Sequence, residues 1–253
     1  MELPRPALSH FIEKIPYPLV FVTVSGAHLY GFPSADSDYD LRGMHVLPAK
    51  EVVGLDAGPE TLQFSEIHHG LDGDIVSHDI KKFFGMLLKR NGYVLEQLTS
   101  PLRLRTSPEH EELLALVPAL LTKHHSHHYL GFAQTEWNLF SKQPEKRVKP
   151  LLYVFRVLLT GIHLMQTGQV EANLPKLNDI FRLGYIPELI QRKIDGKEKA
   201  LLAKADMGFY DSEFTRLLRK LEEAGAKTAL PEAPSARPQL HDILLRLRLK
   251  DRP

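Results

Sequence analysis

The chain has 253 residues, of which 43% are hydrophobic and 25% are charged, so its composition is that of a soluble globular protein with one large or two small domains. Its formal net charge is +1, which neither requires a polyanionic partner such as nucleic acid nor excludes one. Because the chain contains no cysteine, disulfides, thiolate metal sites and cysteine nucleophiles are excluded.

The first hundred residues alternate between strand and helix patterns. Residues 18–26, PLVFVTVSG, predict a buried strand that runs into a turn, and residues 38–48, DYDLRGMHVLP, predict a second, partly exposed strand. Residues 61–69 and 74–78 predict a hairpin, because the GLDG between them supplies glycines for a turn. Asp79 then occupies the N-cap position of a predicted helix.

The chain from Pro108 onward has helical periodicity. Prolines and glycines separate its apolar-periodic segments, which are 108–142, 148–168, 186–205, 212–224 and 240–250. No apolar run is expected to reach the roughly 20 residues that cross a bilayer, and the start of the chain lacks a signal-peptide pattern. We therefore expect a cytoplasmic protein without a membrane partner, and the sequence does not indicate an oligomeric state.

Residues 25–43, SGAHLYGFPSADSDYDLRG, combine glycines with closely spaced acids. In a strand, Asp38 and Asp40 would point to the same face, where their charges repel unless a divalent cation lies between them. An acidic turn is the alternative interpretation of Asp-x-Asp alone. The glycines upstream follow a strand and would let backbone amides approach a phosphate, which favours a phosphate-binding loop beside a metal-binding pair.

These residues resemble the DNA polymerase beta superfamily of nucleotidyltransferases, whose signature is Gly-Ser, a short gap, Gly, and then Ser-Asp-x-Asp after a strand. Gly26, Gly31, Ser37, Asp38 and Asp40 match this signature. SDYDLRG followed by HDIKKFFGMLLKRNGYVLEQL is similar to the stand-alone bacterial branch that is associated with RNA repair. The usual Ser after the first Gly is replaced by Ala27, and Ser25 is the candidate to supply the missing hydroxyl.

The resemblance implies an α+β fold, with a polymerase-beta-like core of a small mixed sheet and helices over residues 1–105 and an α-helical C-terminal region over residues 106–253. It implies two-metal transfer of a nucleoside monophosphate from a nucleoside triphosphate to an acceptor hydroxyl, with release of pyrophosphate. The expected cofactor is Mg²⁺ or Mn²⁺, and the expected acceptor is RNA. Asp38, Asp40 and Asp74 are the expected catalytic metal ligands. Asp79 and Glu66 are the alternatives for the third carboxylate, and His78 would share the face of Asp74. The expected nucleotide-binding residues are Ser25, Gly26, Ala27, Gly31, Ser37, Arg42, Lys149 and Arg156.

Two features of the helical region have competing interpretations. One helix carries a polar stripe that either lines the nucleotide cleft or is a solvated face: Lys149, Tyr153, Arg156, Thr160 and His163. His124 and His128 have a metal-capable spacing, but a solvated helix face explains them as well.

The function also has alternatives. The chain could nucleotidylylate a protein or a small molecule, polymerise on DNA, or be a catalytically weak nucleotide-binding module of a toxin-antitoxin or repair assembly.

Overall fold

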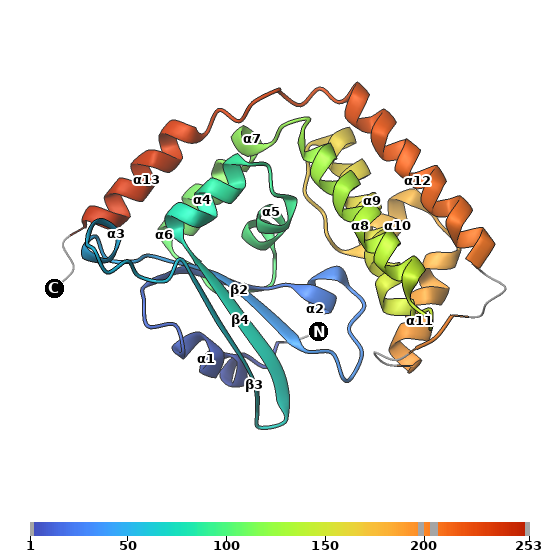
Figure 1. Cartoon of the computed structure of the whole chain (residues 1–253), viewed down its shortest axis with the longest axis horizontal. Coiled ribbons are helices and arrows are strands. Elements are labelled where there is room, and N and C mark those ends of the chain that lie inside the picture. The colour runs from blue at the N-terminus through green and yellow to red at the C-terminus, as the bar shows by residue number, and fades with distance from the viewer. Residues whose placement is uncertain (1–2, 197–199, 203–206, 251–253) are drawn as a thin grey trace. The chain divides into compact units, whose positions relative to one another are not determined.

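The computed structural model describes residues 3–196, 200–202 and 207–250 (Figure 1). The chain divides into two compact units. The first unit is Met1–Gly26, Asp38–Leu120 and Ala233–Pro253, and the second is Ala27–Ser37 and Leu121–Glu232. The predicted boundary between residues 105 and 106 therefore differs from the observed division. The periodicity that predicts a helix does not indicate which core the helix packs on.

A five-stranded mixed sheet forms the centre of the first unit, with the strand order β3-β4-β2-β1-β5. β2 and β4 are parallel, and the other neighbours are antiparallel. The strands are β1 (Leu19–Val24), β2 (Tyr39–His45), β3 (Thr61–His68), β4 (Leu71–Asp79) and β5 (Arg103–Arg105). This sheet with its helices confirms the expected α+β fold.

The β3–β4 hairpin turns earlier than the sequence pattern indicates. His69 and Gly70 have φ angles of 49° and 78°, so two consecutive residues are left-handed, as in the tight turns that match the twist of a hairpin. β4 consequently begins at Leu71, and Gly73 and Asp74 lie within the strand rather than at its start.

Helices cover both faces of the sheet in the first unit (Figure 1). α1 (Arg5–Glu13) covers one face, where its Leu8 and Phe11 share a buried core with Leu41 and Ile75. On the other face, Phe83 of α4 (Ile80–Leu88) meets Phe21 edge to face, with ring centroids 5.5 Å apart. The remaining helices of this unit are α3 (Lys50–Val53), α5 (Gly92–Thr99), α6 (Pro108–Ala115), α7 (Val117–Leu120) and α13 (Arg237–Leu249).

A buried ion pair joins α13 to the sheet. Arg248 donates two hydrogen bonds to the carboxylate of Asp79, at 2.8 and 2.9 Å, and a third to the backbone oxygen of Leu47. Asp79 also accepts from the backbone N–H of Lys81, so it caps α4 as the sequence predicts. One carboxylate therefore links β4, α4 and α13.

α9 (Val148–Thr167) is the central helix of the second unit, and α8, α10, α11 and α12 all pack against it. By length and a mean hydropathy of 1.4 it meets the criterion for a membrane-crossing helix, contrary to the expectation from sequence, but 83% of that window is buried inside the protein. Burial among neighbouring helices accounts for its apolar character. Its neighbours are α8 (His125–Lys142), α10 (Leu174–Phe181), α11 (Tyr185–Gly196) and α12 (Met207–Lys227). α2 (Gly26–Tyr30) lies where the chain passes from the first unit to the second.

Candidate active site

Three carboxylates gather on the face of the sheet opposite α1. Asp40 of β2 lies directly opposite Asp74 of β4 in the parallel pair, so the two side chains point the same way. Asp38 lies two residues before Asp40, and carboxylate oxygens of all three residues fall within 4.8 Å of one another. The structure therefore brings together the three acids that the sequence proposes as metal ligands.

One guanidinium bridges two of these acids. Nη2 of Arg42 lies 2.6 Å from Oδ1 of Asp40, and its Nη1 lies 2.9 Å from Oδ2 of Asp74. Nε of Arg42 donates to the hydroxyl of Tyr93 on α5, which fixes the plane of the fork. Arg42, expected from sequence to bind nucleotide, thus contacts the acids themselves.

The charge of this cluster favours a further cation. Burial raises the pKa of Asp40, Arg42 opposes that shift, and the negative charge of Asp74 adds to it. Asp40 and Asp74 share the single positive charge of Arg42, so this pair of carboxylates retains negative charge when both are ionised. Carboxylate oxygens are the ligands that Mg²⁺ and Mn²⁺ prefer. The residues present therefore fit the divalent cations that the fold implies.

Gly26 makes room for Asp40. Its φ is +59°, and a Cβ at this position would lie 1.8 Å from Oδ2 of Asp40. Ser25 precedes it, with its backbone N–H bonded to the carbonyl of Asp40 at 2.8 Å. The buried hydroxyl of Ser25 has no hydrogen-bond partner among the described residues, and an unsatisfied buried hydroxyl next to Gly26 fits a role in holding a ligand oxygen.

We expect Gly26→Ala to lower both stability and any activity of this site, because the new methyl group displaces the Asp40 carboxylate and strains a left-handed backbone. The strain alone costs about 1–3 kcal/mol. Gly70→Ala is the matched control, since Gly70 has a φ of +78° but a Cβ added there would meet nothing within 4 Å. Urea unfolding and a metal-binding titration of both variants measure the difference. Equal behaviour of the two variants would contradict the steric role of Gly26.

The two alternative third carboxylates lie elsewhere in the unit. Asp79 is buried, caps α4 and pairs with Arg248. Glu66 lies opposite Gly73 in the β3–β4 pair, and Gly73 faces Phe11 of α1, so Glu66 belongs to the α1 face. Only Asp74 of the three candidates shares the face of Asp40. His78, four residues along β4, is bonded to Thr61, and burial lowers its pKa to about 4.

The rest of the sequence motif, Ala27 to Ser37, belongs to the second unit. Ala27 is buried, and Gly31 has a φ of +85° with the Asn173 side chain against it. Lys193 of α11 is fully buried, and its ammonium donates to the hydroxyls of Ser34 and Ser37 at 2.7 Å each. Sequence reasoning missed Lys193, although it is spaced from the buried Ile186 and Leu189 as a core position of a helix would be.

We expect Lys193→Met to destabilise the chain by about 1.5–3 kcal/mol, the usual worth of hydrogen bonds from a charged group. The methionine keeps most of the side-chain volume but removes both donors to the loop. Arg192→Met on the same helix is the control, because the side chain of Arg192 is partly exposed and pairs with the exposed Glu188. Chemical unfolding of both variants measures the effect, and equal losses of stability would contradict it.

The stripe on α9 is not a solvated face. Arg156 is 1% exposed, Thr160 and His163 are also buried, and the guanidinium carbon of Arg156 lies 4.0 Å from the ring centroid of Tyr30. Lys149 lies 6.0 Å from the ring of Tyr153. The contact of Lys149 and Arg156 with a nucleotide stays a prediction.

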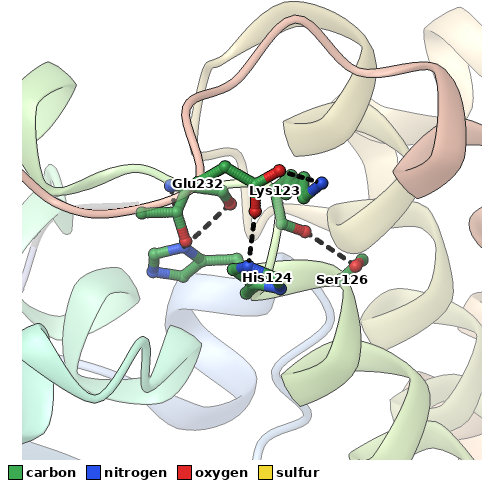
Figure 2. A network of polar contacts seen from close by, with 6 residues as sticks. Lys123, His124, Ser126 and Glu232 are labelled. Atoms are coloured by element: carbon green, nitrogen blue, oxygen red, sulfur yellow. Dashed lines mark hydrogen bonds and ion pairs between the residues drawn. The ribbon is translucent and has the colours of Figure 1, made fainter.

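The histidine-rich start of α8 takes part in a polar network rather than an evident metal pair (Figure 2). Nε2 of His124 lies 3.0 Å from Oε2 of Glu232, and the other carboxylate oxygen of Glu232 forms an ion pair with Lys123. His128 instead contacts the rings of Tyr129 and Phe132. The two histidines that share a metal-capable spacing therefore have different partners.

Comparison with known families decides the relationship of the chain. Residues 5–246 match RlaP, the RNA repair pathway DNA polymerase beta family. The chain belongs to this family. The match confirms the resemblance seen in the sequence motif, and the RlaP family and its fold support a nucleotidyltransferase.

The chain is also similar to two uncharacterized relatives and to one solved structure. Uncharacterized protein MJ0002 of Methanocaldococcus jannaschii is 28% identical over 198 residues, which cover 76% of this RlaP chain and 80% of the relative. Uncharacterized protein YcgL of Bacillus subtilis is 25% identical over 223 residues, which cover 83% of each protein. The solved structure of a nucleotidyltransferase-like protein from Exiguobacterium sibiricum 255-15 has a TM-score of 0.35 and 14% identity, and covers 98% of this chain and 81% of that chain.

Proposed function

We propose that the chain transfers a nucleoside monophosphate from a nucleoside triphosphate to an acceptor hydroxyl, with release of pyrophosphate. The observation that carries the proposal is the position of Asp40 opposite Asp74 on parallel strands, with an oxygen of Asp38 within 4.8 Å of both. Membership of a polymerase beta family supports the same chemistry.

In this proposal Asp38, Asp40 and Asp74 would hold divalent Mg²⁺ or Mn²⁺. When bound there, the cations would supply charge neutralisation for an in-line displacement at phosphorus. Arg42 fixes the positions of Asp40 and Asp74 through its two hydrogen bonds. Gly26 keeps the space beside Asp40 open, and the hydroxyl of Ser25 is available to a phosphate oxygen.

We propose RNA as the acceptor, which rests on the family's association with RNA repair. A protein or small-molecule acceptor, DNA polymerisation and a weakly active nucleotide-binding module are the competing outcomes. No strong overall charge favours nucleic acid, since the formal net charge is +1.

The test is to incubate the chain with each labelled nucleoside triphosphate, Mg²⁺ or Mn²⁺, and separate pools of tRNA, other RNA, DNA, cell protein and cellular small molecules. Label transferred to RNA with stoichiometric pyrophosphate supports the proposal. Label on protein or on a small molecule would show that the acceptor is not RNA. Nucleotide binding without transfer to any pool would favour the nucleotide-binding module. The Asp40→Asn variant is run in parallel as a control. If a contaminant caused the transfer, the amount of transferred label would be the same with this variant as with the original chain.

A further inference from the structure

A second cluster of metal-ligating side chains lies on the α1 face of the sheet. It consists of His10 of α1 and Glu66 and His68 of β3, whose ligand atoms lie within 4.8 Å of one another. Glu66 and His68 pair with Gly73 and Leu71, whereas Asp74 pairs with Ser65. Because neighbouring residues of a strand alternate faces, this cluster and the three aspartates lie on opposite faces of one sheet.

The contacts within the cluster are close and polar. Nε2 of His10 lies 2.5 Å from Oε1 of Glu66, and Nζ of Lys14 lies 2.7 Å from its Oε2. The imidazoles of His10 and His68 stack, with ring centroids 3.6 Å apart and planes 5° from parallel. The side chains of His10 and Glu66 are 36% and 33% exposed, so an ion can reach them from solvent.

We propose that His10, Glu66 and His68 form a zinc site that fastens α1 to β3. Two imidazole nitrogens and one carboxylate oxygen are a common zinc ligand set, with water in the fourth position. Zinc ligands lie about 2.0–2.2 Å from the metal, so their atoms are roughly 3.3 Å apart. Reaching that geometry from the observed cluster requires the hydrogen bond between His10 and Glu66 to open and the two rings to rotate out of their stack.

Lys14 supports this assignment. Its ammonium holds Oε2 of Glu66 and leaves Oε1, the oxygen now bonded to His10, for the metal. Carboxylates that bind metals are commonly oriented by such an outer hydrogen bond.

The two faces of the sheet differ in the metal that they suit. The aspartate face offers oxygen ligands only, which suit Mg²⁺ or Mn²⁺, whereas imidazole nitrogen favours Zn²⁺. The zinc site would join residues 56 positions apart in sequence and would stabilise the packing of α1 on the sheet independently of nucleotide chemistry.

The test is a calorimetric titration of the full chain with Zn²⁺ in the presence of millimolar Mg²⁺, repeated in the Asp40→Asn variant. We expect one zinc per chain in both proteins and a zinc-dependent rise in the melting temperature. His10→Ala and His68→Ala should each weaken this binding at least about 10-fold. Glu66→Gln, which keeps the shape of the side chain, should weaken it as well.

His69→Asn is the matched control, because asparagine tolerates the left-handed φ of 49° and His69 lies outside the ligand set. It should bind zinc as the original chain does. Absence of zinc binding in the Asp40→Asn variant, or unchanged affinity in both histidine variants, would overturn the proposal. The melting temperatures of all variants without zinc identify any that fail to fold. If the histidine variants fail to fold, the zinc affinity of Glu66→Gln tests the proposal instead, and an unchanged affinity would overturn it.

Discussion

Asp40→Asn and Asp74→Asn are each expected to reduce nucleotidyl transfer by more than about 100-fold. Mutation of residues that only orient a metal ligand already lowers metal affinity or activity by about 10–100-fold, and these two residues are proposed as ligands themselves. Each change removes one charged oxygen ligand from the cluster in which the carboxylates lie within 4.8 Å of one another. Arg42 keeps its other carboxylate in either variant, so the fold should survive. Initial rates of label transfer under saturating Mg²⁺ measure the effect.

Asp72→Asn is the matched control for these variants. Asp72 lies on β4 two residues before Asp74 and is exposed, so its replacement removes an equal charge from the same strand outside the cluster. We expect it to retain activity. Melting curves with and without Mg²⁺ separate folding from function: the metal should stabilise the original chain and Asp72→Asn but not Asp40→Asn. Transfer by Asp40→Asn at the original rate would contradict the assignment of the site.

Arg248→Ala is expected to lower the free energy of unfolding by about 3–5 kcal/mol, the usual cost of removing one partner of a buried ion pair. The side chains of Arg248 and Asp79 are 8% and 3% exposed, so the carboxylate would remain buried without its cation. Arg246→Ala on the same helix is the control, because the ion pairs of Arg246 with Glu112 and Asp242 are solvent-exposed and such pairs contribute about 0–1 kcal/mol. Equal losses in urea unfolding at pH 7 would contradict the role of the buried pair.

The same pair predicts a pH dependence. Burial by itself raises the pKa of Asp79, but hydrogen bonds from Arg248 and the backbone outweigh it, and the pKa in the folded chain is lowered. A lowered carboxyl pKa contributes stability above the unfolded value of about 3.9 and loses it as the pH falls through the folded value. The difference in stability between the original chain and Arg248→Ala should therefore shrink below about pH 4. Unfolding series at falling pH measure it, and a constant difference would contradict the linkage.

Local patterns predicted the strands and the acids of the site but not how they meet. The alternation of DYDLRG predicted that Asp38 and Asp40 share a face, and the family resemblance added Asp74; the structure brings carboxylate oxygens of all three within 4.8 Å of one another. β2 and β4 are neighbours in the sheet although β3 lies between them in the sequence. Their parallel pairing is therefore a long-range contact, and no local signal specifies its register.

The burial of two helical cations was not predicted, although Arg156 was named as a nucleotide-binding candidate. Arg156 and Lys193 look from sequence like the polar face of a helix, since lysine and arginine are almost never fully buried unless paired. Here a tyrosine ring and two serine hydroxyls receive them. Those partners come from residues 30, 34 and 37, more than a hundred positions away in sequence, so periodicity within one helix could not identify them.

The ion pair between Asp79 and Arg248 also sets an order of events during translation. Its partners are 169 residues apart, and a ribosome adding about 5–20 residues per second needs roughly ten to thirty seconds between them. Throughout that interval a nascent chain has made the strands that carry Asp40 and Asp74 but lacks the guanidinium that neutralises Asp79. The sheet therefore gains the stability that this ion pair contributes only after the residues of the second unit from 121 to 232 have been synthesised.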